Sequence, residues 1–383
     1  MDFQYFSPTQ LIVSPGAVSR IGDIAASMGK KAFVALSASV SNGGCAEKLL
    51  HFLTSKNIQV VEYIKPFGEP SVEMTSSATQ AAKAAQCDMV ISLGGGSVID
   101  LAKAVAGLVT NGGVIEDYLE GVGEGRAVTK PGLPHIAIPT TAGAGAEVTR
   151  NAVIRSPKGR FKKSFRSPHL YPAVAILDAE LSLSLPAEQT AYSGMDAITQ
   201  LIESYISKRA VPITDALAFY GLELALPAIK AVFQDGSQIE QREKMLLAST
   251  ISGICLANAG LGLAHGFAAG LGALYDIPHG KACAILMPHA LKFNRCAEQD
   301  KIARLGRLIT DDQSLKKGEY ADLIINYMFD LNKQFNIPAD LSEFNIPHDE
   351  IPLLVKMSMG NSMSGNPITV NNIIAQTIME ALI

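Results

Sequence analysis

The chain has 383 residues, more than one hydrophobic core usually serves, so its length predicts two domains. Hydrophobic residues make up 48% and charged residues 18% of the sequence, a composition typical of a globular protein. The formal net charge is only −4, and the sequence has neither a run of lysine and arginine nor an uncharged apolar run of membrane-spanning length, so we expect no nucleic-acid partner and no membrane.

The sequence also indicates a cytoplasmic protein. Its first residues lack the basic segment followed by an apolar core that marks a signal peptide. The five cysteines are scattered, odd in number and without a CxxC pair, which is typical of free thiols in a reducing compartment. Cys255 and Cys283 lie in apolar segments, and we predict that both are core residues.

The first half of the chain alternates short apolar runs with amphipathic segments. This alternation predicts βαβ units and a parallel sheet. The expected strands are residues 11–13, 32–36, 60–63, 89–93, 135–139, 153–154 and 173–177. The expected helices are residues 17–28, 45–57, 72–85 and 98–109, and residues 156–163 are expected to form a charged hairpin-like loop.

A glycine turn follows the strand at residues 89–93. It reads Gly94, Gly95, Gly96, Ser97 and leads directly into a predicted helix. Bare backbone N–H groups at a helix N-terminus can bind a diphosphate, and glycine lets the backbone approach it closely. The spacing is not GxGxxG, so the alternative of a plain turn stays open.

A second segment of small and hydroxyl-bearing residues follows the strand at 135–139. It contains Thr140, Thr141 and Thr149. Ligands of open α/β sheets bind at the carboxyl ends of the strands, so these threonines would line the same site as the glycine turn. The alternative is a turn of small residues before a helix.

The composition changes near residue 185. From Ala187 onward the pattern is helical, and we expect the helices to be broken at the prolines, namely Pro212, Pro227, Pro278, Pro288, Pro338, Pro347 and Pro367. We therefore predict an α/β domain over residues 1–185 and a helical domain over 186–383, with the ligand cleft between them.

The helical half contains four polar side chains in apolar surroundings. Asp196 and Gln200 share one face of a helix, His265 lies in an apolar helical pattern, and His279 follows Pro278. Buried imidazoles and carboxylates need partners, and two histidines with a carboxylate suit zinc or iron(II). Two hydrogen-bonded core histidines are the alternative.

These segments together resemble the iron-containing, or group III, alcohol dehydrogenases. The resemblance covers nearly the whole chain and rests on residues 94–103, 139–149, 194–197 and 265–280. It implies a Rossmann-like, dinucleotide-binding domain over residues 1–185, followed by an all-α, metal- and substrate-binding domain over 186–383, the dehydroquinate synthase-like architecture. It also implies an NAD(P)-dependent alcohol dehydrogenase or aldehyde reductase that uses Fe²⁺ or Zn²⁺, acts on a small alcohol or aldehyde, and forms a homo-oligomer such as a dimer.

The resemblance also assigns roles to residues. Gly95, Gly96 and Ser97 would hold the cofactor diphosphate with Asp100 close by; Thr140, Thr141 and Thr149 would line the cofactor, Lys162 would lie near its ribose, and Asn151 would lie on the substrate side. Ser37 stands where an acidic residue would select NAD over NADP, so neither cofactor is excluded. No residue is assigned as a catalytic acid or base.

Three positions depart from the family pattern. Gln200 replaces a histidine ligand, Ala269 replaces a second histidine that would relay protons, and Ile368 replaces a basic residue. The ligand set Asp196, Gln200, His265 and His279 would therefore bind metal more weakly or bind a different metal. Two alternatives remain: a metal-free enzyme of the maleylacetate reductase or sugar-phosphate cyclase type, and a nucleotide-binding protein that has lost catalysis.

Overall fold

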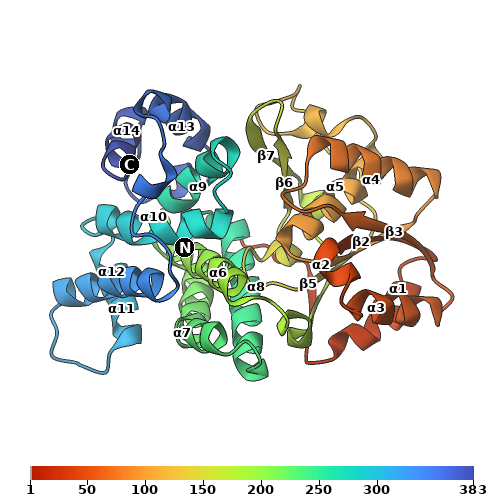
Figure 1. The fold of residues 1–383 in the computed structure, drawn as a ribbon, viewed down its shortest axis with the longest axis horizontal. Helices are drawn as coiled ribbons and strands as arrows, with labels where there is room; N and C mark the ends of the chain where they lie inside the picture. Colours follow the sequence, from red (N-terminus) through yellow and green to blue (C-terminus); the bar gives the residue numbers. More distant parts are fainter. Residues whose placement is uncertain (1) are drawn as a thin grey trace. The chain divides into compact units, whose positions relative to one another are not determined.

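A computed structural model describes residues 2–383, which divide into two compact units (Figure 1). The α/β unit comprises Ser7–Leu185, and the helical unit comprises Pro186–Ile383 together with residues 2–6. The first residues join the helical unit because the Asn258 side chain accepts a hydrogen bond from the Phe6 N–H (2.8 Å) and donates one to the Phe6 carbonyl (3.0 Å). This attachment was not predicted from the sequence.

The α/β unit contains a six-stranded parallel sheet, as expected. Its strands are β1 (Gln10–Val13), β2 (Lys31–Ser37), β3 (Gln59–Lys65), β4 (Met89–Gly94), β5 (His135–Pro139) and β8 (Val174–Leu177). Across the sheet they lie in the order β1-β8-β5-β4-β2-β3, and every pairing is parallel. The chain moves outward from β2 to β3 and then returns to the other side of β2 with β4, so the strand order reverses between β2 and β4.

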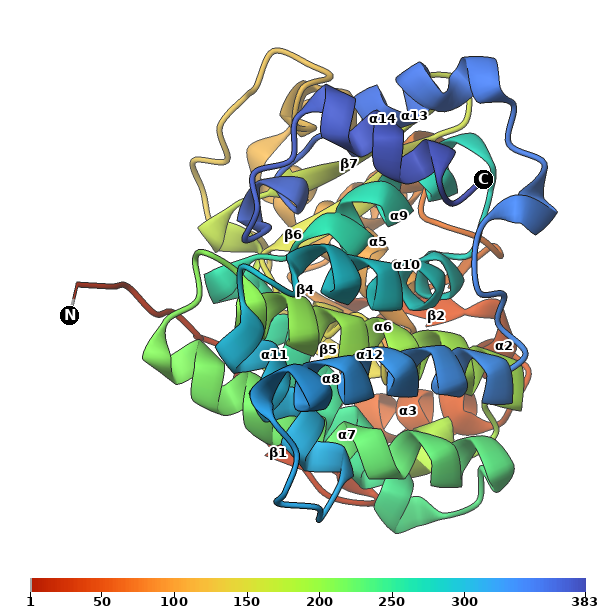
Figure 2. The ribbon, with the colours of Figure 1, turned by 90° about the vertical axis from the view of Figure 1, so that its left-hand side faces the viewer.

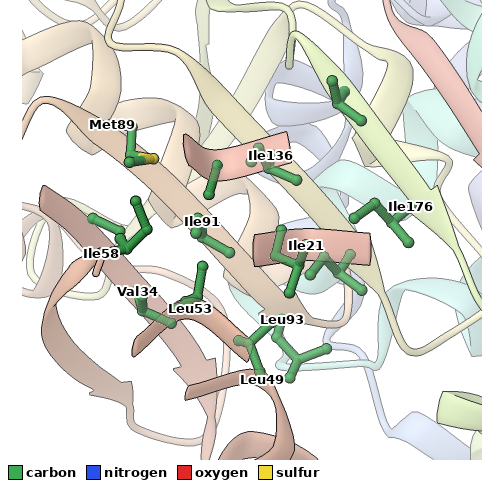
Figure 3. Close-up of a cluster of buried hydrophobic side chains, with 14 of the residues drawn as sticks. Ile21, Val34, Leu49, Leu53, Ile58, Met89, Ile91, Leu93, Ile136 and Ile176 are labelled. Carbon is green, nitrogen blue, oxygen red and sulfur yellow. The ribbon is translucent and has the colours of Figure 1, made fainter. Parts of the chain in front are cut away.

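Helices cover both faces of the sheet. They are α1 (Ile21–Ala26), α2 (Ala38–Ser41), α3 (Cys45–Thr54), α4 (Val72–Ala84) and α5 (Gly96–Asn111). Alternate residues of β2 enter opposite cores: Val34 and Leu36 pack with α1 and α3, whereas Phe33 and Ala35 pack with α4 and α5. Figure 3 shows the first of these cores. Because both faces are covered, the strands are nearly continuous apolar runs.

A two-stranded antiparallel hairpin follows the sheet strands in the chain. It consists of β6 (Asn151–Ser156) and β7 (Phe161–Arg166). The prediction of a loop over residues 156–163 was therefore wrong for its second half, which belongs to β7. The charged sequence of β7 hid the strand, since only Phe165 of that strand is fully buried.

The second unit is helical throughout, and no strand occurs in its described residues (Figure 2). Its α-helices are α6 (Ala187–Ile206), α7 (Pro212–Gln234), α8 (Ile239–Ala259), α9 (Leu263–Leu274), α10 (His279–Asn294), α11 (Gln299–Gly306), α12 (Lys317–Gln334), α13 (Ile351–Ser358) and α14 (Asn372–Glu380). The predicted fold class, a Rossmann-like domain followed by an all-α domain, is confirmed.

Two of the predicted helix breaks are wrong. Pro227 lies inside α7 and Pro288 lies inside α10. A proline inside a helix removes one backbone hydrogen bond, but burial of the helix against its neighbours offsets that loss. Pro212 and Pro278 do lie at helix starts, where a missing N–H costs little.

Helix α7 is long and apolar enough to cross a membrane by length and composition alone. In this fold it is a packed helix of the helical unit, and its side chains Ala218, Leu222 and Ile229 are fully buried. Gly221 of α7 faces Leu201 of α6 and Ile251 of α8 at close range. The apolar sequence of α7 is therefore explained by packing in the protein core.

A buried histidine in the sheet makes the stability of the α/β unit depend on pH. The His135 Nε2 atom pairs with the Ser92 hydroxyl (2.8 Å), and burial lowers the pKa of His135 from 6.5 to about 3. Between these two values the unfolded chain binds one more proton than the folded chain. Lowering the pH from 6.5 toward 3 therefore destabilises the fold, by about 1.4 kcal/mol per pH unit from this residue.

We expect His135→Gln to reduce the slope of unfolding free energy against pH between pH 4 and 6. The expected reduction is about 1.4 kcal/mol per pH unit, the contribution of one proton. The amide keeps a hydrogen-bonding group beside Ser92 but does not titrate. Urea unfolding at a series of pH values measures the slope. His169→Gln, at an exposed position of the same unit, is the matched control and should leave the slope unchanged. Equal slopes for wild type and His135→Gln would contradict the assignment.

Candidate metal centre and cofactor site

Helix α6 carries three buried polar side chains toward the interior of the helical unit. Asp196, Gln200 and Glu203 are spaced by four and three residues, so they lie along one face of the helix. Each of them is at most 5% exposed. Buried polar groups at this density need partners, and the partners come from α8, α9 and α10.

Glu203 fixes the start of α9 and the orientation of His265. Its carboxylate accepts hydrogen bonds from the Ala264 N–H (2.6 Å) and from His265 Nδ1 (2.7 Å). A carboxylate at a helix N-terminus is favoured by the unpaired N–H groups and the helix dipole. With Nδ1 held by Glu203, His265 presents Nε2 to Asp196 Oδ1 at 3.1 Å.

Helix α10 adds two further donors. His279 is its first residue, after the N-cap Pro278, and Cys283 follows one helical turn later. The His279 Nε2 atom lies 3.8 Å from both Asp196 Oδ1 and Cys283 Sγ. A β-carbon at Gly280 would collide with the Tyr192 carbonyl of α6, so glycine permits this close approach of the two helices.

The four side chains Asp196, His265, His279 and Cys283 form a candidate metal site. Their ligand atoms all lie within 4.8 Å of one another. A tetrahedral ion with ligand bonds of about 2.0–2.3 Å separates its donor atoms by roughly 3.3–3.7 Å, and the distances of 3.1 and 3.8 Å within the cluster lie close to that range. Both the donor types and their spacing therefore fit a divalent transition metal.

The electrostatics of the cluster favour a positive charge at its centre. Burial opposes ionisation of Asp196, but His279 and the hydrogen bond from His265 outweigh burial and lower the pKa of Asp196. Burial also disfavours the charged form of His265, yet Cys283, Asp196 and Glu203 raise the pKa of His265 well above its ordinary value. Burial raises the pKa of the Cys283 thiol to about 12. A bound cation would take the place of the protons that His265 and Cys283 retain.

The structure differs from the sequence interpretation at Cys283 and adds Glu203. Cys283 is fully buried, so its prediction as a core residue is confirmed, but its Sγ atom also lies among the donor atoms of the candidate metal site, which the sequence interpretation did not include. Its spacing of four from His279 on a helix was the signal that could have revealed it. Gln200 directs its carbonyl oxygen to the Ser252 hydroxyl (3.2 Å), and its role as a ligand stays a prediction.

The glycine turn of the α/β unit lies where the strand order reverses. Gly95 is the N-cap of α5, and Gly96 and Ser97 are the first two residues of that helix, whose first N–H groups have no partner within the helix. A β-carbon at Gly94 would lie 3.2 Å from the Ser37 β-carbon, so the ends of β4 and β2 meet here. Ligands of doubly wound sheets bind at this reversal point.

Thr140 and Thr141 lie at the same edge. The Thr140 N–H donates to the Gly94 carbonyl (3.0 Å), and Thr141 Oγ1 lies 3.3 Å from the position of a β-carbon on Gly95. Ser37 caps α2 by accepting a hydrogen bond from the Val40 N–H (3.3 Å). The structure thus brings together the glycine turn, both threonines and Ser37.

Asp100, Thr149 and Asn151 lie deeper, around the fully buried Lys103. The Lys103 ammonium donates to Thr149 Oγ1 (2.9 Å) and the Asn151 carbonyl (2.8 Å), and it lies 3.3 Å from Asp100 Oδ1. Desolvation raises the pKa of Asp100 and lowers that of Lys103. The hydrogen bonds that Lys103 donates to Thr149 and Asn151 therefore connect α5 to the start of β6. Lys162 forms an ion pair with Glu69 (2.7 Å).

A parallel sheet with a glycine turn at its reversal point is the architecture of a dinucleotide-binding domain, and the helical unit supplies donors for a divalent metal. This combination defines the class of metal-assisted, dinucleotide-dependent dehydrogenases. A family model described as iron-containing alcohol dehydrogenase matches residues 8–179, and one described as the C-terminal part of the Fe-containing alcohol dehydrogenase family matches residues 190–383.

Individual relatives agree with these matches. The NAD-dependent methanol dehydrogenase of Bacillus methanolicus is 33% identical over 382 residues and 99% of each chain. The 1,3-propanediol dehydrogenase of Klebsiella pneumoniae is 32% identical over 371 residues and 95% of each chain. The crystal structure of a 1,3-propanediol oxidoreductase superimposes with a TM-score of 0.93 at 31% identity, covering 100% of both chains.

The chain therefore belongs to the iron-containing alcohol dehydrogenase family. It is an oxidoreductase of that family, whose members use a nicotinamide cofactor and a divalent metal.

We expect Glu203→Gln to weaken zinc binding about 10–100-fold, because an amide holds the His265 ring less firmly than a carboxylate does. Competition with a chromophoric zinc chelator measures the affinity. Glu188→Gln on the exposed side of the same helix is the matched control. Equal zinc affinity for Glu203→Gln and wild type would show that Glu203 does not position His265.

Proposed function

We propose that this protein is an NAD(P)-dependent, metal-assisted dehydrogenase that interconverts a small alcohol and its aldehyde. The observation that carries the proposal is the convergence of a carboxylate and two imidazoles, Asp196, His265 and His279, in the interior of the helical unit. Membership of the family supports the reaction class. The names of the methanol and 1,3-propanediol dehydrogenases support a short primary alcohol as substrate.

In this proposal Asp196, His265 and His279 hold the metal, with Gln200 as the fourth ligand expected from its position in the sequence. Glu203 keeps His265 in the tautomer that leaves Nε2 free for the ion. When bound, the metal supplies a Lewis acid that polarises the substrate oxygen, and the nicotinamide accepts or donates the hydride. Asp196 and His265 are buried, which strengthens their electrostatic interaction with a bound ion, whereas His279 is partly exposed.

The cofactor residues are proposed on the same basis. Gly95, Gly96 and Ser97 bind the diphosphate at the start of α5, and Thr140 and Thr141 line the cofactor beside them. Ser37 leaves room for either NAD or NADP, since no carboxylate stands at the end of β2 to repel a 2′-phosphate.

Four other residues complete the proposal for the α/β unit. Lys162 lies near the ribose and Asn151 on the substrate side, while Asp100 and Thr149 support the site through Lys103. We also propose that the protein acts as a homo-oligomer in the cytoplasm. The five cysteines are all free in the structure, as a reducing compartment requires.

An activity screen tests the proposal directly. Protein stripped of metal is loaded with Fe²⁺ or Zn²⁺ and assayed with short alcohols and aldehydes, using NAD(H) and NADP(H) in parallel. We expect absorbance change at the nicotinamide band only in the metal-loaded samples. Full activity without metal would favour the metal-free reductase type. Nucleotide binding by calorimetry without any turnover would identify a protein that only binds the nucleotide.

We expect Gly96→Ala to raise the KM for NADH at least about 10-fold, because the methyl group would fill space needed by the diphosphate. A β-carbon at this position makes only ordinary contact with Ala144, at 3.5 Å, so folding should be preserved. Gly360→Ala, where an added β-carbon meets nothing within 4 Å, is the control. An unchanged KM with a normal melting temperature would remove Gly96 from the cofactor site.

A further inference from the structure

We propose that the thiolate of Cys283 is the fourth protein ligand of the metal, in the place that Gln200 would otherwise take. The inference rests on the proposed metal site and assigns it a donor that the sequence pattern did not suggest. The resulting donor set has one carboxylate oxygen, two imidazole nitrogens and one sulfur.

Cys283 lies where a ligand should lie. It is one helical turn after His279 on α10, so both side chains leave the same face of that helix. Its Sγ atom is 3.8 Å from His279 Nε2 and within 4.8 Å of the donor atoms of Asp196 and His265. An ion bound by His279 and Asp196 would therefore have this sulfur as an immediate neighbour.

The surroundings of Cys283 differ from those of an ordinary buried cysteine. Its neighbours include Asp196, Glu203 and His265, whose charges act on it directly. Cys255 offers the contrast within the same unit: it is equally buried, and the contact of its Sγ atom is with the Thr214 carbonyl (3.6 Å). A sulfur packed among ionisable groups indicates coordination, whereas a sulfur against backbone indicates packing.

The competing donor is less suitable. The Gln200 carbonyl oxygen already accepts a hydrogen bond from the Ser252 hydroxyl, and a neutral amide is a weak ligand for a transition metal. On coordination the Cys283 thiol releases its proton to solvent, and a sulfur lone pair forms the bond to the metal. The thiolate and the Asp196 carboxylate then neutralise a divalent ion, which makes its burial less costly.

A sulfur ligand has a consequence for metal choice. Thiolate is a soft donor that favours zinc and cobalt(II), while carboxylate and amide oxygens favour harder ions. We therefore expect this protein to retain Zn²⁺ in preference to Fe²⁺, although its family is named for iron.

Cobalt substitution tests the ligand without an activity assay. Metal-free protein is loaded with one equivalent of Co²⁺, and bound cobalt is measured after gel filtration. We expect wild type and the matched control Cys255→Ser to show a sulfur-to-cobalt charge-transfer band in the near ultraviolet. We expect Cys283→Ser to lose that band while Gln200→Leu keeps it.

A second measurement needs no variant, so a misfolded Cys283→Ser protein does not decide the matter. X-ray absorption of the zinc-loaded wild type should show one sulfur at about 2.3 Å. Stoichiometric metal without sulfur in its shell would overturn the role of Cys283 and leave the proposed metal site intact. Failure of wild type to retain cobalt or zinc would overturn both proposals.

Discussion

The helical unit depends on one hydrogen bond, between the Glu203 carboxylate and the Nδ1 atom of His265. It joins the last turn of α6 to the first turn of α9, two segments about sixty residues apart in the chain. The same carboxylate also caps α9 through the Ala264 N–H. A single acidic side chain thus fixes where a helix begins, which tautomer a histidine adopts and where its second nitrogen is directed. The site could not keep its geometry if α9 began one residue earlier or later.

Close helix packing provides the second constraint. Gly280 lets α10 approach the backbone of α6, and this approach brings His279 and Cys283 within reach of Asp196. In the α/β unit, the glycines after β4 have the corresponding role, since the turn passes close to Val98 and Ser37. Absence of a side chain therefore decides where ligands can bind in both units.

Much of this organisation could be predicted from the sequence. The apolar runs of the parallel sheet, the glycine turn and the change of composition near residue 185 follow from patterns with a direct physical cause. Strand β7 was missed because its charged side chains do not alternate with apolar residues along the strand. The helices that contain Pro227 and Pro288 were predicted to break there because local propensity cannot register the burial that stabilises them.

Only part of the candidate site was predicted from the sequence, because sequence patterns do not show which helices pack together. Asp196, His265 and His279 were recognisable as polar groups in apolar segments. Cys283 was not, because a cysteine in an apolar helix is compatible with the core as well as with a metal. Glu203 was not predicted as part of the site, because its contact with His265 joins two different helices. The contacts of His265 with Glu203 and Asp196 join residues more than sixty positions apart, and spacing along one helix cannot predict contacts between helices.

The attachment of residues 2–6 to the helical unit shows that the chain does not divide into two consecutive domains. Residues 2–6 belong to the helical unit, and the chain enters the α/β unit at Ser7 and leaves it at Pro186. The α/β unit is therefore an insertion in the helical unit, held by chain at both ends. A single cut near residue 185 would leave the two units connected through the Phe6–Asn258 contact and the peptide beside it. Separating them as independent fragments requires two cuts, and the helical unit would then lose the short segment that precedes the first crossing.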